Sequence, residues 1–152
     1  MKKILILLLL FTTSSFAQTN RFMFHVTNAQ FSTNNFRMGF SYPISNIIFL
    51  GFETESISNG TSTIKNTGAT LHFRTNPIKE LGGTNTYLFG SGFYGQNQLG
   101  DSGRLGMGIR YGITNSMGFH CSVEKTWRNF QYTTTNYTDD AVNISYGITF
   151  GF

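Results

Sequence analysis

The sequence predicts an all-β fold, an eight-stranded antiparallel up-and-down transmembrane β-barrel. Three observations lead to this prediction. Apolar and polar residues alternate with a period of two in successive segments, and no segment has a convincing 3.6-residue period. Charged residues make up 12% of the chain, about half of the ~25% that is usual in soluble proteins. Aromatic residues and glycine are abundant, with 16 Phe and 17 Gly, as is typical of a barrel that crosses a bilayer with strands.

The first 17 residues are interpreted as a signal peptide rather than as part of the fold. Lys2 and Lys3 give a positive start, the run from Ile4 to Phe11 is apolar, and Ser15-Phe16-Ala17 has the small-x-small pattern of a signal peptidase site. The apolar run is too short for a membrane-spanning helix, which needs about 20 residues. Residues 18–152 are therefore expected to form one exported barrel domain.

The first four strands are expected at residues 21–28, 36–42, 47–56 and 67–75. Their apolar face consists of Phe22, Phe24, Val26, Phe36, Met38, Phe40, Tyr42, Ile48, Leu50, Phe52, Ala69, Leu71 and Phe73. The opposite face includes His25, Arg37, Phe49, Glu53, His72 and Arg74. The third strand begins apolar on both faces, so alternation defines its register less sharply than that of the others.

The last four strands are expected at residues 84–94, 104–113, 117–132 and 142–152. Their apolar face consists of Tyr87, Phe89, Phe93, Leu105, Met107, Ile109, Tyr111, Ile113, Met117, Phe119, Cys121, Val123, Val142, Ile144, Tyr146, Ile148, Phe150 and Phe152. The opposite face includes Leu88, Gly90, Gly92, Arg104, Arg110, His120, Ser122, Glu124 and Arg128. Eight strands satisfy the even count of bacterial single-chain barrels.

The connections are expected to alternate in length. Longer polar loops, at 28–35, 57–66, 95–103 and 133–140, follow the odd-numbered strands. Mostly shorter turns, at 43–46, 76–83 and 114–116, follow the even-numbered ones, and the connection 76–83 is longer than this pattern predicts. In an outer-membrane barrel with both ends in the periplasm, the longer set would be extracellular.

The placement of charge indicates which face meets lipid. The charged residues of the strands lie on the Gly/Ser/Thr face, and an arginine on the lipid face costs about 2–4 kcal/mol at the bilayer midplane. Lys125 is the exception, but it lies near the predicted extracellular end, where a lysine can extend to the headgroups. The polar face is therefore predicted to fill the lumen. The alternative is a secreted soluble β-protein whose apolar face forms the core.

The final strand ends on an aromatic residue at the C-terminus and resembles the closing strand of bacterial outer-membrane barrels. The whole of residues 18–152 is similar to small eight-stranded barrels of the OmpA/OmpX kind. This resemblance implies a location in the outer membrane of a Gram-negative bacterium, in contact with membrane lipids and lipopolysaccharide. It also implies that Tyr146, Phe150 and Phe152 act as a signal to the barrel-assembly machinery. A monomer is expected.

A polar network is expected in the lumen, formed by Arg37, Glu53, His72, Arg74, Arg110, Glu124 and Arg128. An eight-stranded barrel is only wide enough to be filled by its own side chains, and buried charges must pair. Arg37, Arg74 or Arg110 is predicted to bridge Glu53 and Glu124. Such a network is either a static plug or a gate whose rearranged pairs admit small ions.

An enzymatic alternative comes from one short motif. His120-x-Ser122, with Glu124 nearby, resembles the His-x-Ser of the barrel enzyme that removes acyl chains from lipid A. That enzyme needs the trio to face lipid, whereas alternation turns these residues inward. Residues two apart on a strand lie about 7 Å from each other, which is expected to be too far for mutual hydrogen bonds. No catalytic residue is therefore predicted.

Other ligand classes find little support. Cys121 is the one cysteine, and no metal-ligand spacing surrounds it, so neither a metal nor another cofactor is predicted. The chain has no basic stripe of the kind that binds nucleic acid. The predicted function is a non-enzymatic outer-membrane barrel with a role in envelope structure or surface interaction. A narrow channel and a lipid A-modifying enzyme are the alternatives.

Overall fold

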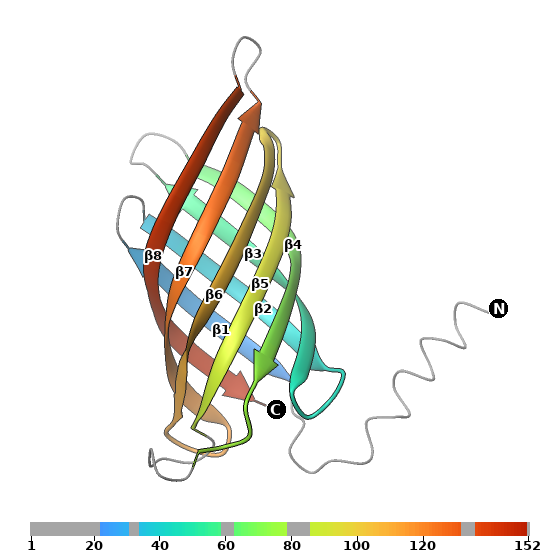
Figure 1. Cartoon of the computed structure of the whole chain (residues 1–152), viewed down its shortest axis with the longest axis vertical. Helices are drawn as coiled ribbons and strands as arrows, with labels where there is room; N and C mark the ends of the chain where they lie inside the picture. The colour runs from blue at the N-terminus through green and yellow to red at the C-terminus, as the bar shows by residue number, and fades with distance from the viewer. Residues whose placement is uncertain (1–21, 31–33, 59–62, 79–85, 132–135, 152) are drawn as a thin grey trace, which may run out of the picture.

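The structure is a computed structural model, and it describes residues 22–30, 34–58, 63–78, 86–131 and 136–151. Its strands are β1 (Met23–Gln30), β2 (Asn34–Pro43), β3 (Ile48–Ser58), β4 (Thr63–Arg74), β5 (Tyr87–Asn97), β6 (Gly100–Gly112), β7 (Met117–Gln131) and β8 (Asn136–Gly151). Each strand pairs antiparallel with its sequence neighbours, and β1 pairs with β8 to close the barrel (Figure 1). The predicted fold class is confirmed. The segments that the structure describes contain no helix long and apolar enough to cross a membrane.

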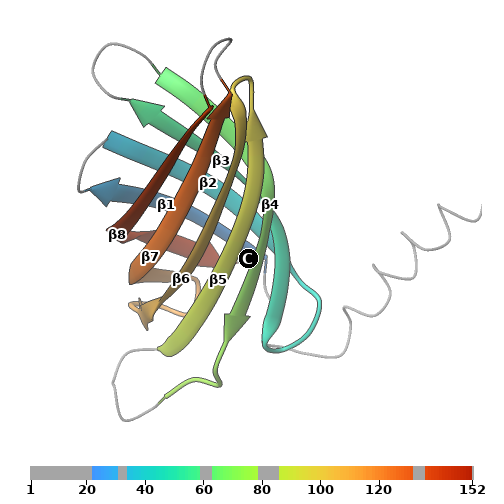
Figure 2. The ribbon, with the colours of Figure 1, turned by 45° about the horizontal axis from the view of Figure 1, so that its top comes forward.

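The two ends of the barrel carry different connections. The lower end, at the bottom of Figure 1, carries the turns 44–47 and 113–116, the ends of β4 and β8 and the start of β5. At the upper end, β5 joins β6 through only Gln98 and Leu99. Figure 2, with the top turned toward the viewer, shows the tilted strands curving around the barrel axis.

The predicted loops of the upper end were too long. Residues 95–103 are strand apart from the two-residue turn at 98–99. β3 extends to Ser58, β4 already begins at Thr63, and β8 begins at Asn136. The Ser/Thr/Asn composition of these segments is typical of loops, but here the backbone continues in paired strands. Polar side chains of these segments face outward, as at Lys65 of β4 and Gln96 of β5, which are exposed.

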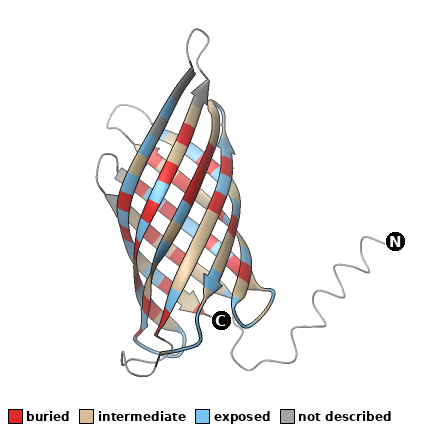
Figure 3. Cartoon of the chain, in the orientation of Figure 1, coloured by how far each residue is buried: buried red, intermediate tan, exposed pale blue. Residues whose placement is uncertain are grey.

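The two faces of the strands differ as charge placement predicted. Along most strands, buried and exposed residues alternate (Figure 3). Large apolar side chains face outward around the barrel. On β3, Leu50 is 50% exposed, so the third strand presents the face to the outside that the sequence predicted. Arg37, Glu53, Arg104, Arg110, Glu124 and Arg128 are buried in the lumen. A soluble barrel with an apolar core does not fit this arrangement.

The predicted orientation of β5 was wrong. Tyr87 and Phe93 are only 4% and 5% exposed and point inward, while Leu88 and Tyr94 are exposed. Alternation fixes which residues share a face but does not say which face is outside. On β5 the outward positions 90 and 92 are glycines, which carry no side chain to mark the lipid side. The inward rings contact arginines: the guanidinium carbon of Arg104 lies 4.9 Å from the ring centroid of Phe93, a distance at which a cation is attracted to the face of a ring.

Candidate functional site: the polar lumen

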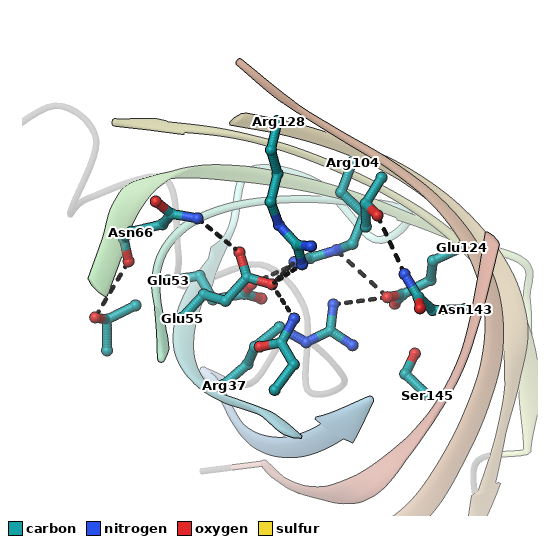
Figure 4. A network of polar contacts seen from close by, with 12 residues as sticks. Arg37, Glu53, Glu55, Asn66, Arg104, Glu124, Arg128, Asn143 and Ser145 are labelled. Carbon is teal, nitrogen blue, oxygen red and sulfur yellow. Dashed lines mark hydrogen bonds and ion pairs between the residues drawn. The ribbon is translucent and has the colours of Figure 1, made fainter. Parts of the chain in front are cut away.

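Six charged side chains gather in the lumen and are here called the ionic cluster: Arg37, Glu53, Glu55, Arg104, Glu124 and Arg128. They come from β2, β3, β6 and β7 and point toward one another (Figure 4). Arg37 Nη1 lies 2.7 Å from Glu124 Oε2, and Arg128 Nη2 lies 3.6 Å from Glu55 Oε1. Three arginines thus face three glutamates, and the cluster is neutral.

Arg104 connects the carboxylates of the cluster. Its Nη2 lies 2.5 Å from Glu53 Oε1, its Nε lies 3.6 Å from Glu124 Oε2, and its Nη1 lies 4.0 Å from Glu55 Oε1. A planar guanidinium with five N–H groups suits this position because it can face several carboxylates at once. The prediction that Arg37, Arg74 or Arg110 bridges Glu53 and Glu124 was therefore wrong, and Arg104 is the bridge.

Neutral polar groups surround the cluster and complete the hydrogen bonding of its carboxylates. Asn66 Nδ2 donates to Glu55 Oε2 at 3.1 Å, and Asn35 Nδ2 donates to the other oxygen of the same carboxylate. The Ser122 hydroxyl donates to Glu124 Oε1 at 3.0 Å. A buried charge is tolerated when it is paired and hydrogen-bonded, and these donors meet that requirement for Glu55 and Glu124. Nε and Nη2 of Arg37 and Nε and Nη1 of Arg104, by contrast, are buried without a hydrogen-bond partner.

The lumen backbone gives the charged side chains room through glycine. A Cβ atom added to Gly106 of β6 would lie 2.7 Å from Glu124 Cγ, and one added to Gly118 of β7 would lie 2.7 Å from Arg110 Cζ. Both distances are shorter than van der Waals contact. The glycine-rich inner face is therefore a packing requirement of the charged side chains on the neighbouring strands.

Next to the ionic cluster lies a histidine layer formed by His25, His72 and His120. The ring centroid of His25 lies 5.5 Å from that of His72 and 6.4 Å from that of His120. His25 Nε2 lies 2.9 Å from Glu53 Oε2, which connects the layer to the cluster.

The ring nitrogens of His72 and His120 are directed at hydroxyl groups rather than at a point shared with His25. His120 contacts Thr27 and Thr149 at 3.0 and 2.9 Å, and His72 contacts Thr70 at 3.1 Å. Within the described part of the chain, no group of three His, Cys, Asp or Glu residues is arranged to hold a metal ion.

Toward the lower end the lumen has a different character. Phe49, Arg74, Tyr87 and Arg110 form a group here called the basic mouth. Arg74 Cζ lies 4.6 Å from the Phe49 ring centroid and 5.2 Å from that of Tyr87, and Arg110 Cζ lies 5.5 Å from the Tyr87 centroid. The basic mouth and the histidine layer border one cavity of about 50 Å³.

The residues predicted to form one network are thus divided among three groups. Arg37, Glu53, Glu124 and Arg128 belong to the ionic cluster, His72 belongs to the histidine layer, and Arg74 and Arg110 belong to the basic mouth. Glu55 was missed, although it lies two residues after Glu53 and alternation places both on the same face. The division itself could not be predicted, because strand tilt and stagger determine which side chains meet across a barrel.

The hydrolase-like trio is not assembled. The expectation that its members are too far apart was wrong for Ser122 and Glu124, whose side chains lean together and share the 3.0 Å bond. His120, however, bonds to Thr27 and Thr149 instead of to Ser122. All three residues are buried in the lumen, as alternation predicted, and do not face lipid.

The C-terminal residues are only partly described. Tyr146 is exposed on the outer face of β8, and the ring centroid of Phe150 lies 6.4 Å from that of Phe24 on β1. Phe152 and the predicted signal peptide, residues 1–17, lie outside the described residues. No observation tests the roles predicted for them.

Comparison with known proteins identifies the fold. No protein-family model and no curated protein matches the sequence. Among solved structures, the N-terminal β-barrel domain of OprF from Pseudomonas aeruginosa matches with a TM-score of 0.61 and 11% identity, over 88% of this chain and 98% of that one. A de novo designed transmembrane β-barrel matches with a TM-score of 0.59 and 14% identity, over 90% and 98%. The chain therefore has the fold of a small transmembrane β-barrel, of the kind that OmpA/OmpX-like outer-membrane proteins share.

Proposed function

We propose that this protein is a non-enzymatic integral barrel of the bacterial outer membrane whose lumen is closed by the ionic cluster. In this proposal it is a monomer that contacts membrane lipids and lipopolysaccharide. It serves envelope structure or surface interaction. The barrel-assembly machinery recognises its last strand through Tyr146, Phe150 and Phe152.

One observation carries the proposal: the barrel is apolar outside and charged inside. This is the reverse of a soluble barrel, and it is what a lipid environment requires, because charge on the lipid face is costly. The neutral, hydrogen-bonded ionic cluster supports a closed lumen rather than an open pore. The separation of His120 from Ser122 supports a non-enzymatic role.

Heat-modifiability tests the proposal. Outer-membrane fractions of the producing bacterium are run on a detergent gel with and without boiling. A closed membrane barrel stays folded in cold detergent and changes mobility only after boiling. If the protein shows no shift and is found in the soluble periplasmic or secreted fraction, the proposal is wrong.

A narrow channel is a second candidate, and the position of Arg104 favours it. Arg104 lies within 4.0 Å of three carboxylates, so it can exchange partners without leaving a glutamate far from a cation. Such an exchange could open a path for small ions along the lumen. Arg110, one of the three arginines predicted to bridge Glu53 and Glu124, belongs to the basic mouth and is not the residue to test.

The channel is tested by conductance in planar lipid bilayers. The variant Arg104→Gln removes the shared cation, and Lys125→Gln removes a cation from the outer face as a matched control. A gate predicts that only the first variant changes conductance. Glu53→Gln provides a second test if Arg104→Gln lacks the heat-dependent gel shift of a folded barrel. Unchanged conductance in folded variants would leave the static plug as the better description.

A further inference from the structure

We propose that the histidine layer is a pH-sensitive element of the lumen, whose three rings are not all protonated while the barrel is folded. Mild acid then favours states in which the layer has come apart. This inference goes beyond the proposed function, which assigns no pH response to the barrel.

All the histidines of the chain lie in this one layer. The sequence contains three, and they stand on β1, β4 and β7. All three line the same cavity of the lumen. Histidine is the side chain whose charge ordinarily changes between about pH 5 and 8. A response of the barrel to pH in this range is therefore expected to come from a single place.

The three rings are close enough for their charges to repel one another. The His25 centroid lies 5.5 Å from that of His72 and 6.4 Å from that of His120, and His72 and His120 also interact electrostatically. Repulsion at such separations is stronger in the lumen than in water, because the effective dielectric constant is lower there. Two neighbouring imidazolium ions are therefore costly in this layer.

One ring of the layer is paired with a carboxylate. His25 Nε2 lies 2.9 Å from Glu53 Oε2, so a proton on His25 is compensated. Among the residues that the structure describes, no carboxylate lies within ion-pair distance of His72 or His120. The other oxygen of Glu53 already faces Arg104. The layer thus compensates one proton, whereas a second or third would meet the repulsion of the first.

The charged groups of the neighbouring strands do not alter this balance. Those that face the layer or line its cavity are Arg37 of β2, Glu53 of β3, Arg74 of β4, Arg104 and Arg110 of β6, and Glu124 of β7. The described lining residues of β5 and β8 are Tyr87, Phe89, Ser91 and Thr149, none of which is charged near neutral pH. Each of the two carboxylates already pairs with an arginine of the ionic cluster.

Packing holds the rings in this arrangement. A Cβ atom added to Gly39 of β2 would overlap the His25 ring, and one added to Gly147 of β8 would lie 2.8 Å from His120 Cε1. Both nitrogens of His120 contact threonine hydroxyls, at 3.0 and 2.9 Å. Because a hydroxyl accepts as well as donates, these contacts persist when the ring is protonated. The repulsion is therefore relieved only when the surrounding side chains rearrange or the barrel unfolds.

The sign of the pH effect follows from proton uptake. In the unfolded chain, each histidine gains a proton as the pH falls through about 6.5. The folded layer gains fewer protons, so unfolding takes up protons and the free energy of unfolding decreases as the pH falls. Each histidine that is protonated only on unfolding raises the unfolding equilibrium constant about tenfold between about pH 7.5 and 5.5. Two such histidines give an expected rise of about 100-fold.

Urea titration of the whole barrel in lipid vesicles at these two pH values tests the inference, with Trp127 as the fluorescent reporter. The matched control combines His25→Gln, His72→Gln and His120→Gln, which keep polar side chains in the layer but do not titrate. Its unfolding equilibrium constant should change by less than about threefold, because carboxylates ordinarily titrate near pH 4. A loss of stability that is equal at both pH values reports packing, so the pH dependence is the quantity that decides.

Two further measurements keep the test decisive if the triple variant lacks the heat-dependent gel shift of a folded barrel. His72→Gln alone should reduce the pH effect from about 100-fold to about tenfold. Nuclear magnetic resonance of the imidazole groups in the folded, unmodified barrel at the lower pH should show fewer than three imidazolium ions.

The inference is overturned if all three imidazoles are charged in the folded barrel, if the stability of the unmodified barrel does not depend on pH in this range, or if the triple variant keeps the full dependence. Because the gel shift is read separately, such a failure would not count against the proposed membrane barrel.

Discussion

Glu124 and Lys125 are neighbours on β7, yet their surroundings are opposite. The Glu124 side chain points into the lumen, is 6% exposed and faces Arg37 and Arg104. The Lys125 side chain points outward, is 63% exposed and lies 3.9 Å from Asp140 of β8. Both residues form ion pairs, but only one of the pairs is removed from water. The comparison indicates that the face of the strand, rather than the residue type, determines how much a charge contributes to the stability of this barrel.

The largest expected effect comes from removing Glu124, the buried partner of Arg37 and Arg104. Glu124→Ala leaves Arg37 and Arg104 in the lumen without this carboxylate, and breaking a buried ion pair costs about 3–5 kcal/mol. The free energy of unfolding is measured by urea titration of the barrel in lipid vesicles, with the single Trp127 as the fluorescent reporter. A loss below about 1 kcal/mol would mean that the cluster rearranges around the gap and does not act as a rigid plug.

The second prediction moves a charge to the centre of the lipid face. Ile109 is the central residue of the outward apolar positions 105, 107, 109, 111 and 113, the first four of which lie on β6. Ile109→Arg is expected to destabilise the barrel by about 2–4 kcal/mol in vesicles, because an arginine at the midplane must leave water without a partner. Lys125→Arg, which keeps the existing charge near the upper edge of the apolar belt, is the control and should be close to neutral. Equal effects of the two variants would contradict the assignment of the outer face to lipid.

Much of this contrast could be predicted from the sequence, because a period of two separates the faces and the charges identify the inner one. Glu124, Arg128 and Arg37 were placed correctly in the lumen for that reason. Tyr87 and Phe93 were placed on the wrong face, because an aromatic ring suits a lipid-facing position as well as a position beside an arginine. The bridging role of Arg104 was also missed, because contacts across the lumen depend on the tilt and stagger of strands distant in sequence.

The third prediction tests the room that glycine gives the buried glutamate. In Gly106→Ala the new Cβ would lie 2.7 Å from Glu124 Cγ, and displacing a well-packed side chain costs about 1–3 kcal/mol. Gly92→Ala is the matched control on the outer face, where the nearest atom would be Leu105 Cδ2 at 3.6 Å. The control should be neutral or slightly stabilising, by up to about 1 kcal/mol, because alanine restricts the unfolded chain more than glycine does. If both variants lose stability equally, the effect belongs to glycine in the strand rather than to the space beside Glu124.

The smallest expected effect is that of the exposed pair. Lys125→Ala removes a cation whose side chain and partner are 63% and 56% exposed, and exposed pairs contribute about 0–1 kcal/mol. A double-mutant cycle with Asp140→Ala isolates the interaction, and its energy should shrink further as salt is raised, because exposed charges are screened. The same cycle applied to Arg37 and Glu124 should give a much larger coupling with little salt dependence. If the outer pair couples as strongly as the inner one, the face of the strand does not determine the strength of the pair.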